Sequence, residues 1–284
     1  MDFSTGLAYG WGWFGRWRLI VKILGSGTSS GVPMIGCQCP VCTSSDSRNK
    51  RTRSSAAIEL DRGTILIDTA TDLRTQALRW GLERVDAVLY THAHADHLHG
   101  IDDLRLYNLR QLKPIPCYTN AETARRLRAY FDYIFDPAGA DSFRPSLELE
   151  VVEAPFSLLD ETVIPVPLLH GEMPVLGFRL RRFAYLTDVS AIPDRSWELL
   201  DGLDLLVLDA LRPRPHPTHF GLDQALAVID RLRPRRTLLT HLSHQFDHEA
   251  TNEKLPIGVE LAYDGMIVEL EDEACGGEPE RSLQ

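Results

Sequence analysis

The sequence contains one histidine-rich stretch, Val88-Leu89-Tyr90-Thr91-His92-Ala93-His94-Ala95-Asp96-His97-Leu98-His99-Gly100. The apolar run over residues 87–90 predicts a short buried strand. Four of the ten histidines follow it within eight residues, together with one carboxylate. These groups suit zinc, manganese or ferrous iron, and a single ion takes only three or four protein ligands. The pattern His-x-His-x-Asp-His therefore predicts half of a two-metal site. The alternative is a polar surface loop that happens to be rich in histidine.

At three later points a polar residue follows an apolar run of the kind found in buried strands. His170 follows residues 166–169, Asp188 follows 184–187, and His241 follows 238–240. A single histidine at a strand end is more often structural than functional, so each of these residues is a candidate ligand only.

Strand-like and helix-like segments alternate along the chain. Residues 55–60 and 64–67 have the pattern of a β-hairpin, and residues 221–232 have the apolar spacing of an amphipathic helix. This alternation predicts an α/β fold, a four-layer αββα sandwich in which two mixed sheets face each other. We expect the domain over 18–271, an N-terminal extension over 1–17 and a C-terminal tail over 272–284.

The bulk composition limits the partners. The chain has 284 residues, 44% of them hydrophobic, and a formal net charge of −10. The charge does not favour nucleic acid, and no apolar run approaches the roughly 18–20 residues of a membrane span. The N-terminus lacks a basic region and a continuous apolar region, so it does not resemble a signal peptide. We therefore expect a cytoplasmic protein with no membrane partner.

The cysteines are unevenly distributed. Cys37, Cys39 and Cys42 are crowded together, whereas Cys117 and Cys275 are isolated. This is not the pattern of an extracellular disulfide framework. Crowded thiols in a reducing compartment indicate metal ligands, and the Cys-x-Cys-x-x-Cys spacing is compatible with zinc.

The motifs resemble those of a known family. The segment 91–97, Thr-His-Ala-His-Ala-Asp-His, looks like the signature of the metallo-β-lactamase-fold hydrolases. Residues 240–244, Thr-His-Leu-Ser-His, and 215–222, Pro-His-Pro-Thr-His-Phe-Gly-Leu, resemble one branch, that of the phosphoribosyl 1,2-cyclic phosphate phosphodiesterase of phosphonate breakdown. The resemblance covers roughly residues 19–270 and implies the same αββα fold. One departure is the segment 68–72, where many relatives have glycine and proline, so the shape of this loop is left open.

The resemblance also implies the roles of individual residues. Two active-site metal ions, zinc or manganese, would be held by two sets of ligands bridged by Asp188: His92, His94 and His170 for one ion, and Asp96, His97 and His241 for the other. A separate structural zinc would be held by Cys37, Cys39, Cys42 and His244.

Two residues are predicted to be catalytic. The resemblance implies that His219 lies near the substrate phosphate and protonates the leaving alkoxide. Asp96 is predicted to be catalytic as well as a ligand. On the residues alone, His219 could instead begin the helix that starts near Gly221.

Water bridging two such ions would be largely hydroxide near neutral pH, which suits hydrolysis of a phosphodiester, a lactone or a thioester. We predict an enzyme, a binuclear phosphodiesterase acting on a small cyclic or nucleotide-like phosphodiester. The alternatives are a transfer-RNA 3′-processing endonuclease of the same fold, a thioesterase or lactonase, and a metal-binding scaffold without turnover. The endonucleases carry a long basic, glycine-rich arm, and no such insert is visible. We expect a small phosphorylated substrate as partner, no nucleic acid, and a homodimer as one possible assembly.

Overall fold

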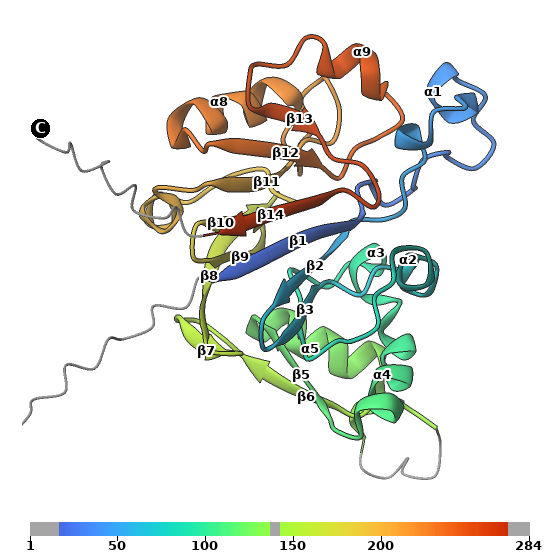
Figure 1. The fold of residues 1–284 in the computed structure, drawn as a ribbon, viewed down its shortest axis with the longest axis vertical. Coiled ribbons are helices and arrows are strands. Elements are labelled where there is room, and N and C mark those ends of the chain that lie inside the picture. The colour runs from blue at the N-terminus through green and yellow to red at the C-terminus, as the bar shows by residue number, and fades with distance from the viewer. Residues whose placement is uncertain (1–16, 137–142, 272–284) are drawn as a thin grey trace, which may run out of the picture.

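A computed structural model describes residues 17–136 and 143–271 (Figure 1). Most of the predicted N-terminal extension, residues 1–16, and the predicted C-terminal tail, residues 272–284, lie outside the described residues. Trp17 at the start of the described chain packs against the core, and its ring lies 4.2 Å from the guanidinium of Arg181.

Within the described residues, the first sheet has seven strands in the order β14-β1-β2-β3-β4-β5-β6. Strands β14, β1, β2 and β3 pair antiparallel, whereas β3, β4, β5 and β6 pair parallel. The bounds of the strands are β1 (Arg18–Gly25), β2 (Ser55–Leu60), β3 (Gly63–Ile67), β4 (Ala87–Leu89), β5 (Ile115–Thr119), β6 (Leu147–Val151) and β14 (Ile267–Glu271).

The second sheet also has seven strands in the described part of the chain, in the order β13-β12-β11-β10-β9-β8-β7. Strands β7 to β10 pair antiparallel, whereas β10 to β13 pair parallel. The bounds are β7 (Phe156–Leu158), β8 (Glu161–His170), β9 (Met173–Leu180), β10 (Phe183–Leu186), β11 (Leu205–Asp209), β12 (Arg236–Thr240) and β13 (Val259–Leu261).

Helices lie beside both sheets: α2 to α5 beside the first, and α8 beside the second (Figure 1). None of the described helices is long and apolar enough to cross a membrane. The bounds are α1 (Pro40–Thr43), α2 (Leu73–Trp80), α3 (Ala95–Leu98), α4 (Leu104–Gln111), α5 (Ala121–Tyr130), α6 (Asp132–Phe135), α7 (Asp194–Trp197), α8 (Leu222–Leu232) and α9 (His248–Asn252), with 3-10 turns at Ser47–Asn49, Ile101–Asp103 and Glu198–Leu200.

Alternation of apolar side chains along the strands produces the layers. On β3, Ile65 and Ile67 belong to a core shared by the two sheets, whereas Leu66 belongs to a second core formed with the helices of the first sheet. On β11, Val207 faces the shared core and Leu208 faces a third core that includes α8. Successive side chains of a strand point to opposite faces, so each sheet is buried on both sides. The predicted αββα sandwich is confirmed.

The parallel strands bring polar residues to one edge of each sheet. Asp68 and His92 lie just beyond β3 and β4, which are parallel neighbours. Asp188, Asp209 and His241 lie at the ends of β10, β11 and β12, which are also parallel neighbours. Because the carboxyl ends of parallel strands meet at the same edge, residues far apart in the sequence are brought together there.

The sequence pattern did not predict helix α4, which follows the histidine-rich loop. Its apolar residues lie on more than one face: Leu104 and Tyr107 are buried, whereas Leu106 and Leu109 are exposed. The periodicity that indicates an amphipathic helix is therefore weak in this segment.

Candidate active site

The loop between β4 and α3 places four predicted ligands next to each other. His92 and His94 lie in the loop, and their ring centroids are 4.6 Å apart. Asp96 and His97 lie in the first turn of α3. His92 and His97 are fully buried, whereas His94 is on the more open side. The change from extended chain to helix separates the four side chains into two pairs.

The other three predicted ligands come from the second sheet. His170 ends β8, Asp188 follows β10, and His241 follows β12. The structure brings the seven side chains together in two groups that share Asp188, and the donor atoms within each group lie within 4.8 Å of one another. The groups are His92, His94, His170 and Asp188, and Asp96, His97, Asp188 and His241.

Asp188 lies between the two groups and presents one oxygen to each. Its Oδ2 is 3.4 Å from Nε2 of His92. Its Oδ1 is 3.3 Å from Nε2 of His97 and 3.2 Å from Nε2 of His241. A carboxylate with its two oxygens turned toward different imidazole groups is the arrangement expected of a ligand that bridges two metal ions.

The donor atoms fit a metal ion better than they fit one another. Nε2 of His97 and both ring nitrogens of His241 are buried and have no hydrogen-bond partner among the described residues. Buried polar atoms are normally satisfied, so such atoms need an explanation, and an ion is one. Imidazole and carboxylate are ligands of divalent zinc, manganese and iron. The group of side chains is therefore suited to divalent metal.

The electrostatics agree with this interpretation. Burial lowers the pKa of His92 and of His94, to about 4 for His94, so both imidazoles are neutral and able to bind metal. Burial raises the pKa of the Asp188 carboxyl, but His241, His97 and the other nearby imidazoles lower it more, and the pKa lies well below its usual range. Burial lowers the pKa of His97 and of His241, but the carboxylates of Asp188 and Asp96 raise both pKa values by more. The field of these carboxylates thus favours positive charge where a cation would sit.

Three residues of the site have strained backbones. Asp68, Asp188 and His241 have φ of +58°, +53° and +58°, in the left-handed region that residues with a side chain rarely adopt. Each follows a buried strand. Such strain costs about 1–3 kcal/mol and is found where a site requires a particular side-chain direction. The strain at all three positions is consistent with strands that end by turning their side chains into one site.

Asp68 is a site residue that the sequence did not reveal. It is fully buried, and its Oδ2 accepts a hydrogen bond from Nδ1 of His97 at 2.6 Å. The same oxygen accepts a hydrogen bond from the Thr91 hydroxyl at 2.8 Å, and that hydroxyl lies 3.0 Å from Nδ1 of His92. Asp68 therefore orients imidazoles of both groups and leaves their Nε2 atoms toward Asp188. It lies in the segment 68–72 whose shape was left open, and only its position after a strand could have indicated it.

His219 lies beside the metal-ligand candidates. Its ring stacks on His241 at 4.8 Å between centroids and meets His170 at 4.5 Å. Its Nδ1 lies 2.8 Å from Oδ2 of Asp209. If Nδ1 donates to this carboxylate, Nε2 is left free to exchange a proton with a ligand. Asp209 is the last residue of β11, and the sequence pattern alone did not indicate a role for it.

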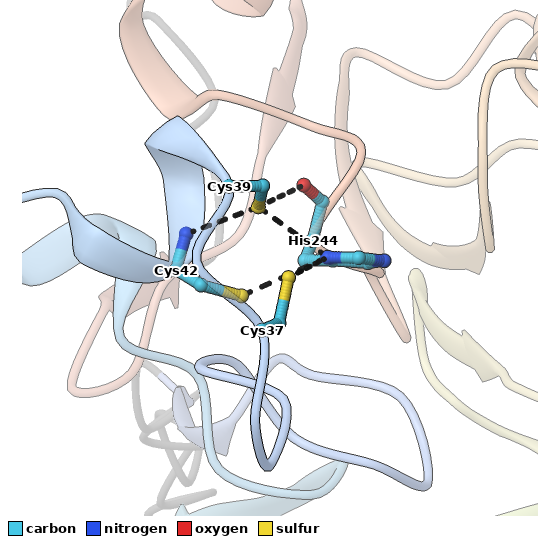
Figure 2. Close-up of side chains that lie close together, drawn as sticks. All are labelled: Cys37, Cys39, Cys42 and His244. Carbon is cyan, nitrogen blue, oxygen red and sulfur yellow. Dashed lines mark hydrogen bonds between the residues drawn. The ribbon is translucent and has the colours of Figure 1, made fainter.

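The predicted cysteine cluster also forms. Sγ of Cys37, Cys39 and Cys42 lie 3.3, 3.4 and 3.7 Å from Nδ1 of His244 (Figure 2). A tetrahedral zinc with Zn–S bonds of about 2.3 Å would separate its ligands by roughly 3.5 Å, so these side chains fit zinc. The backbone N–H of Cys42 lowers the pKa of the Cys39 thiol to about 6, whereas burial raises the pKa of the Cys42 thiol to about 11.

The two clusters are joined by one short segment. His241 and His244 are three residues apart, and the residues between them are held on both sides. The backbone N–H of Leu242 donates to the carbonyl of Ser26, and Nη1 of buried Arg51 donates to the carbonyl of Ser243.

Comparisons with known proteins place this arrangement in a family. A family model for the beta-lactamase superfamily domain matches residues 63–242. A crystal structure of a new diphosphatase from the PhnP family has a TM-score of 0.85 and 44% sequence identity, over 90% of this chain and 99% of that chain.

Two further relatives are more distant or longer. The octanoyltransferase of Porphyromonas gingivalis is 38% identical over 249 residues, which are 86% of this chain but only 50% of that protein. This chain thus spans half the length of that relative. The zinc-bound PqqB structure from Methylobacterium extorquens has a TM-score of 0.70 at 21% identity, over 88% of this chain and 100% of that chain, and shows the shared fold alone. Because the family model matches more than half of the chain, and the PhnP-family structure matches nearly all of it at 44% identity, this chain belongs to the beta-lactamase superfamily and, within it, to the PhnP family.

Proposed function

We propose that this protein is a metal-dependent phosphodiesterase that hydrolyses a small phosphodiester. The observation that carries the proposal is the position of Asp188, whose two oxygens face His92 on one side and His97 and His241 on the other. Two divalent cations held side by side are a common arrangement for displacement at phosphorus. The 44% identity to a diphosphatase of the PhnP family also supports this class of reaction.

We propose that His92, His94 and His170 hold one cation, that Asp96, His97 and His241 hold the other, and that Asp188 binds both. Cations bound there would acidify water and offset negative charge on the phosphate. The nitrogen-rich donor set suits zinc, and manganese is the second candidate. The zinc in the PqqB relative, which shares the fold, also favours zinc.

His219 and Asp96 are the proposed catalytic residues. His219 would give the proton on Nε2 to the leaving oxygen, because its Nδ1 faces Asp209 and an alkoxide is a strong base. Asp209 would fix the tautomer and the orientation of that ring. Oδ2 of Asp96 lies 3.3 Å from Nε2 of His97, so its other oxygen could accept a proton from the attacking water.

We propose that Cys37, Cys39, Cys42 and His244 hold a third ion, a zinc with a structural role. The donor atoms of the four side chains lie within 4.8 Å of one another, close enough to surround one zinc ion, which supports this assignment. We also propose that residues 18–271 form one domain, that the protein is cytoplasmic, where thiols such as these stay reduced, and that it assembles as a homodimer.

A diphosphate diester is the second candidate substrate, because the PhnP-family relative is a diphosphatase. The same site could serve both reactions, since each displaces an oxygen at phosphorus. They differ at the leaving group: an alkoxide must be protonated, whereas a phosphate monoester leaves as a stable anion.

The proposed function can be tested on the purified protein after chelation and after reloading with zinc or manganese. The substrate panel contains bis-p-nitrophenyl phosphate, a cyclic nucleotide, a phosphoribosyl cyclic phosphate, a dinucleoside diphosphate, a lactone and a glutathione thioester. We expect metal-dependent turnover of the phosphodiesters or of the diphosphate, and no turnover of the lactone or the thioester. Turnover confined to the lactone or the thioester, or no turnover by fully loaded protein, would contradict the proposal.

A further inference from the structure

A hollow lies next to the proposed metal site. Its volume is about 520 Å³, within the range of small-molecule sites. His94 forms part of its wall, so the hollow is continuous with the more open side of the metal-ligand groups. The other lining residues are the two alanines on either side of His94 together with His99, Arg126, Tyr130 and Phe131.

Arg126 brings a guanidinium group to the hollow, in a protein of net charge −10. On α5, Arg125 and Arg126 both bind the single carboxylate of Glu122, at 2.8 and 2.7 Å. One negative charge therefore offsets only one of the two guanidinium groups. Nη1 of Arg126 also lies 3.4 Å from the hydroxyl of Tyr130, so the guanidinium is held at the wall of the hollow.

Aromatic side chains also line the hollow. Tyr130, at the end of α5, is 51% exposed. Phe131 and His99 meet edge to face, with centroids 5.6 Å apart and planes at 89°. Aromatic rings beside an arginine are the elements that bind a flat nucleobase, by stacking and by donation to its ring acceptors.

We propose that this hollow binds the nucleoside part of the substrate, with the base against Tyr130 and Phe131 and with Arg126 at its edge. The proposal rests on the proposed phosphodiesterase function. It makes the substrate a nucleotide-like diester and makes Tyr130 and Arg126 residues that determine specificity.

The position of the hollow also indicates which product it holds. His94 and His219 both contact His170, the former at 5.1 Å and the latter at 4.5 Å between centroids. The leaving oxygen belongs near His219, whereas the hollow lies on the His94 side. When a water oxygen bonds to phosphorus, the bond to the leaving oxygen breaks and that oxygen takes a proton. The group in the hollow then stays on phosphorus, and the product is a nucleoside monophosphate.

Product binding tests this proposal directly. The probes are adenosine 5′-monophosphate and ribose 5-phosphate, which differ by the base alone, each measured by calorimetry on metal-loaded protein and as an inhibitor of diester hydrolysis. We expect the nucleotide to bind about tenfold more tightly, the size of one stack of a base on an aromatic ring.

Matched variants separate the hollow from its surroundings. Tyr130→Ala should remove most of this tenfold difference, whereas Tyr130→Phe should keep it, and Arg126→Met should weaken nucleotide binding severalfold. Tyr133→Ala and Arg128→Met are the controls, because Tyr133 is similarly exposed and Arg128 is on the same helix, yet neither lines the hollow. These controls should behave as the wild type.

The outcomes distinguish this inference from the proposed function. Equal affinity for the two probes in the wild type, or a difference that survives Tyr130→Ala, would overturn the nucleoside site even if diesters are hydrolysed. If no diester is hydrolysed, the proposed function fails, and the calorimetric comparison still decides whether the hollow binds the base.

Discussion

The histidine–aspartate site and the cysteine cluster are built in opposite ways. The three cysteines of the cluster lie within residues 37–42, in helix α1 and the short loop before it, and only His244 comes from elsewhere. The ligands of the other site span residues 92–241 and come from both sheets. The geometry of the cysteine cluster is therefore mainly local, whereas that of the histidine–aspartate site depends on the registry of two sheets across the central core.

The difference indicates how each cluster should respond to change. A local cluster can lose its ion while the sheets remain intact, but a site assembled from strand ends cannot be rearranged one ligand at a time. The segment from His241 to His244 connects them, and Arg51 fixes its position through the carbonyls of Ser243 and Phe246, at 3.2 and 2.9 Å. We expect disturbance to travel from the cysteine cluster to the histidine–aspartate site through this segment.

The largest effect is expected from Asp188→Ala, which removes the carboxylate that both groups share. Elemental analysis should show loss of both active-site ions and retention of the cysteine-bound zinc. Activity should fall by more than the roughly 10–100-fold that is typical of losing an outer partner such as Asp68. The Asp68→Asn variant is the matched control, because it alters a buried carboxylate of the same site without removing a proposed ligand. Full metal content and activity in Asp188→Ala would show that this residue does not bridge.

The second largest effect is expected from a change at His219, which should lower the rate of hydrolysis without loss of metal from either cluster. His219→Ala should keep its metals and lose about 10²–10⁴-fold on an alkyl phosphodiester, the range for removing acid catalysis. On bis-p-nitrophenyl phosphate the loss should be much smaller, because nitrophenolate leaves without a proton. The measurement is the ratio of kcat/KM values on the two substrates. Equal losses on both substrates would indicate that His219 binds the phosphate instead. No loss on either would indicate that His219 has only a structural role near the start of the helix.

Sequence motifs revealed the ligands better than the groups that hold them. The histidines and Asp188 follow apolar runs, so their convergence at the ends of parallel strands could be predicted. Asp68 and Asp209 also follow strands, but a lone aspartate at a strand end has many other roles. Their functions depend on partners 29 and 10 residues away, which only the folded sheets bring within hydrogen-bonding distance.

The fold shows the same limit. The alternating apolar strands and the strongly amphipathic α8 were predictable because burial on one or both faces leaves a period in the sequence. The short strands β7 and β13 have only three residues each, too few for any period to be recognised. The hollow beside His94 was also beyond prediction, since it requires α5 to lie against the loop after β4.

A smaller effect is expected from Cys39→Ser, which tests the connection between the two clusters. The variant should lose the cysteine-bound zinc and melt at a lower temperature, because metal binding contributes to folding. Released from zinc, His244 no longer fixes the segment that carries His241, so affinity for the second active-site metal should fall by about 10–100-fold. Cys117→Ser, at a buried cysteine outside the cluster, controls for thiol loss alone. Unchanged melting temperature and zinc content in Cys39→Ser would contradict the connection.

The smallest effect is expected from Asp86, a buried carboxylate that belongs to neither cluster. Burial raises the pKa of Asp86, but hydrogen bonds from Arg84, Lys113 and the backbone of Thr64 lower it by more than burial raises it. The folded-state pKa of Asp86 therefore lies below the usual value. The stabilisation is therefore present above the unfolded-state pKa, about 3.9, and is lost as the pH falls through the lower folded-state pKa. Asp86→Asn should cost about 1–3 kcal/mol of unfolding free energy at pH 7 and less near pH 3, with the metal content at pH 7 unchanged. Denaturant unfolding of the wild type and of Asp86→Asn across this pH range measures the difference in unfolding free energy.

If the unfolding free energies of the two proteins changed in parallel with pH, Asp86 would not be the source of the pH dependence. If Asp86→Asn lost metal at pH 7, a general loss of stability would be enough to disturb the clusters, and metal loss in Cys39→Ser would no longer demonstrate a specific connection.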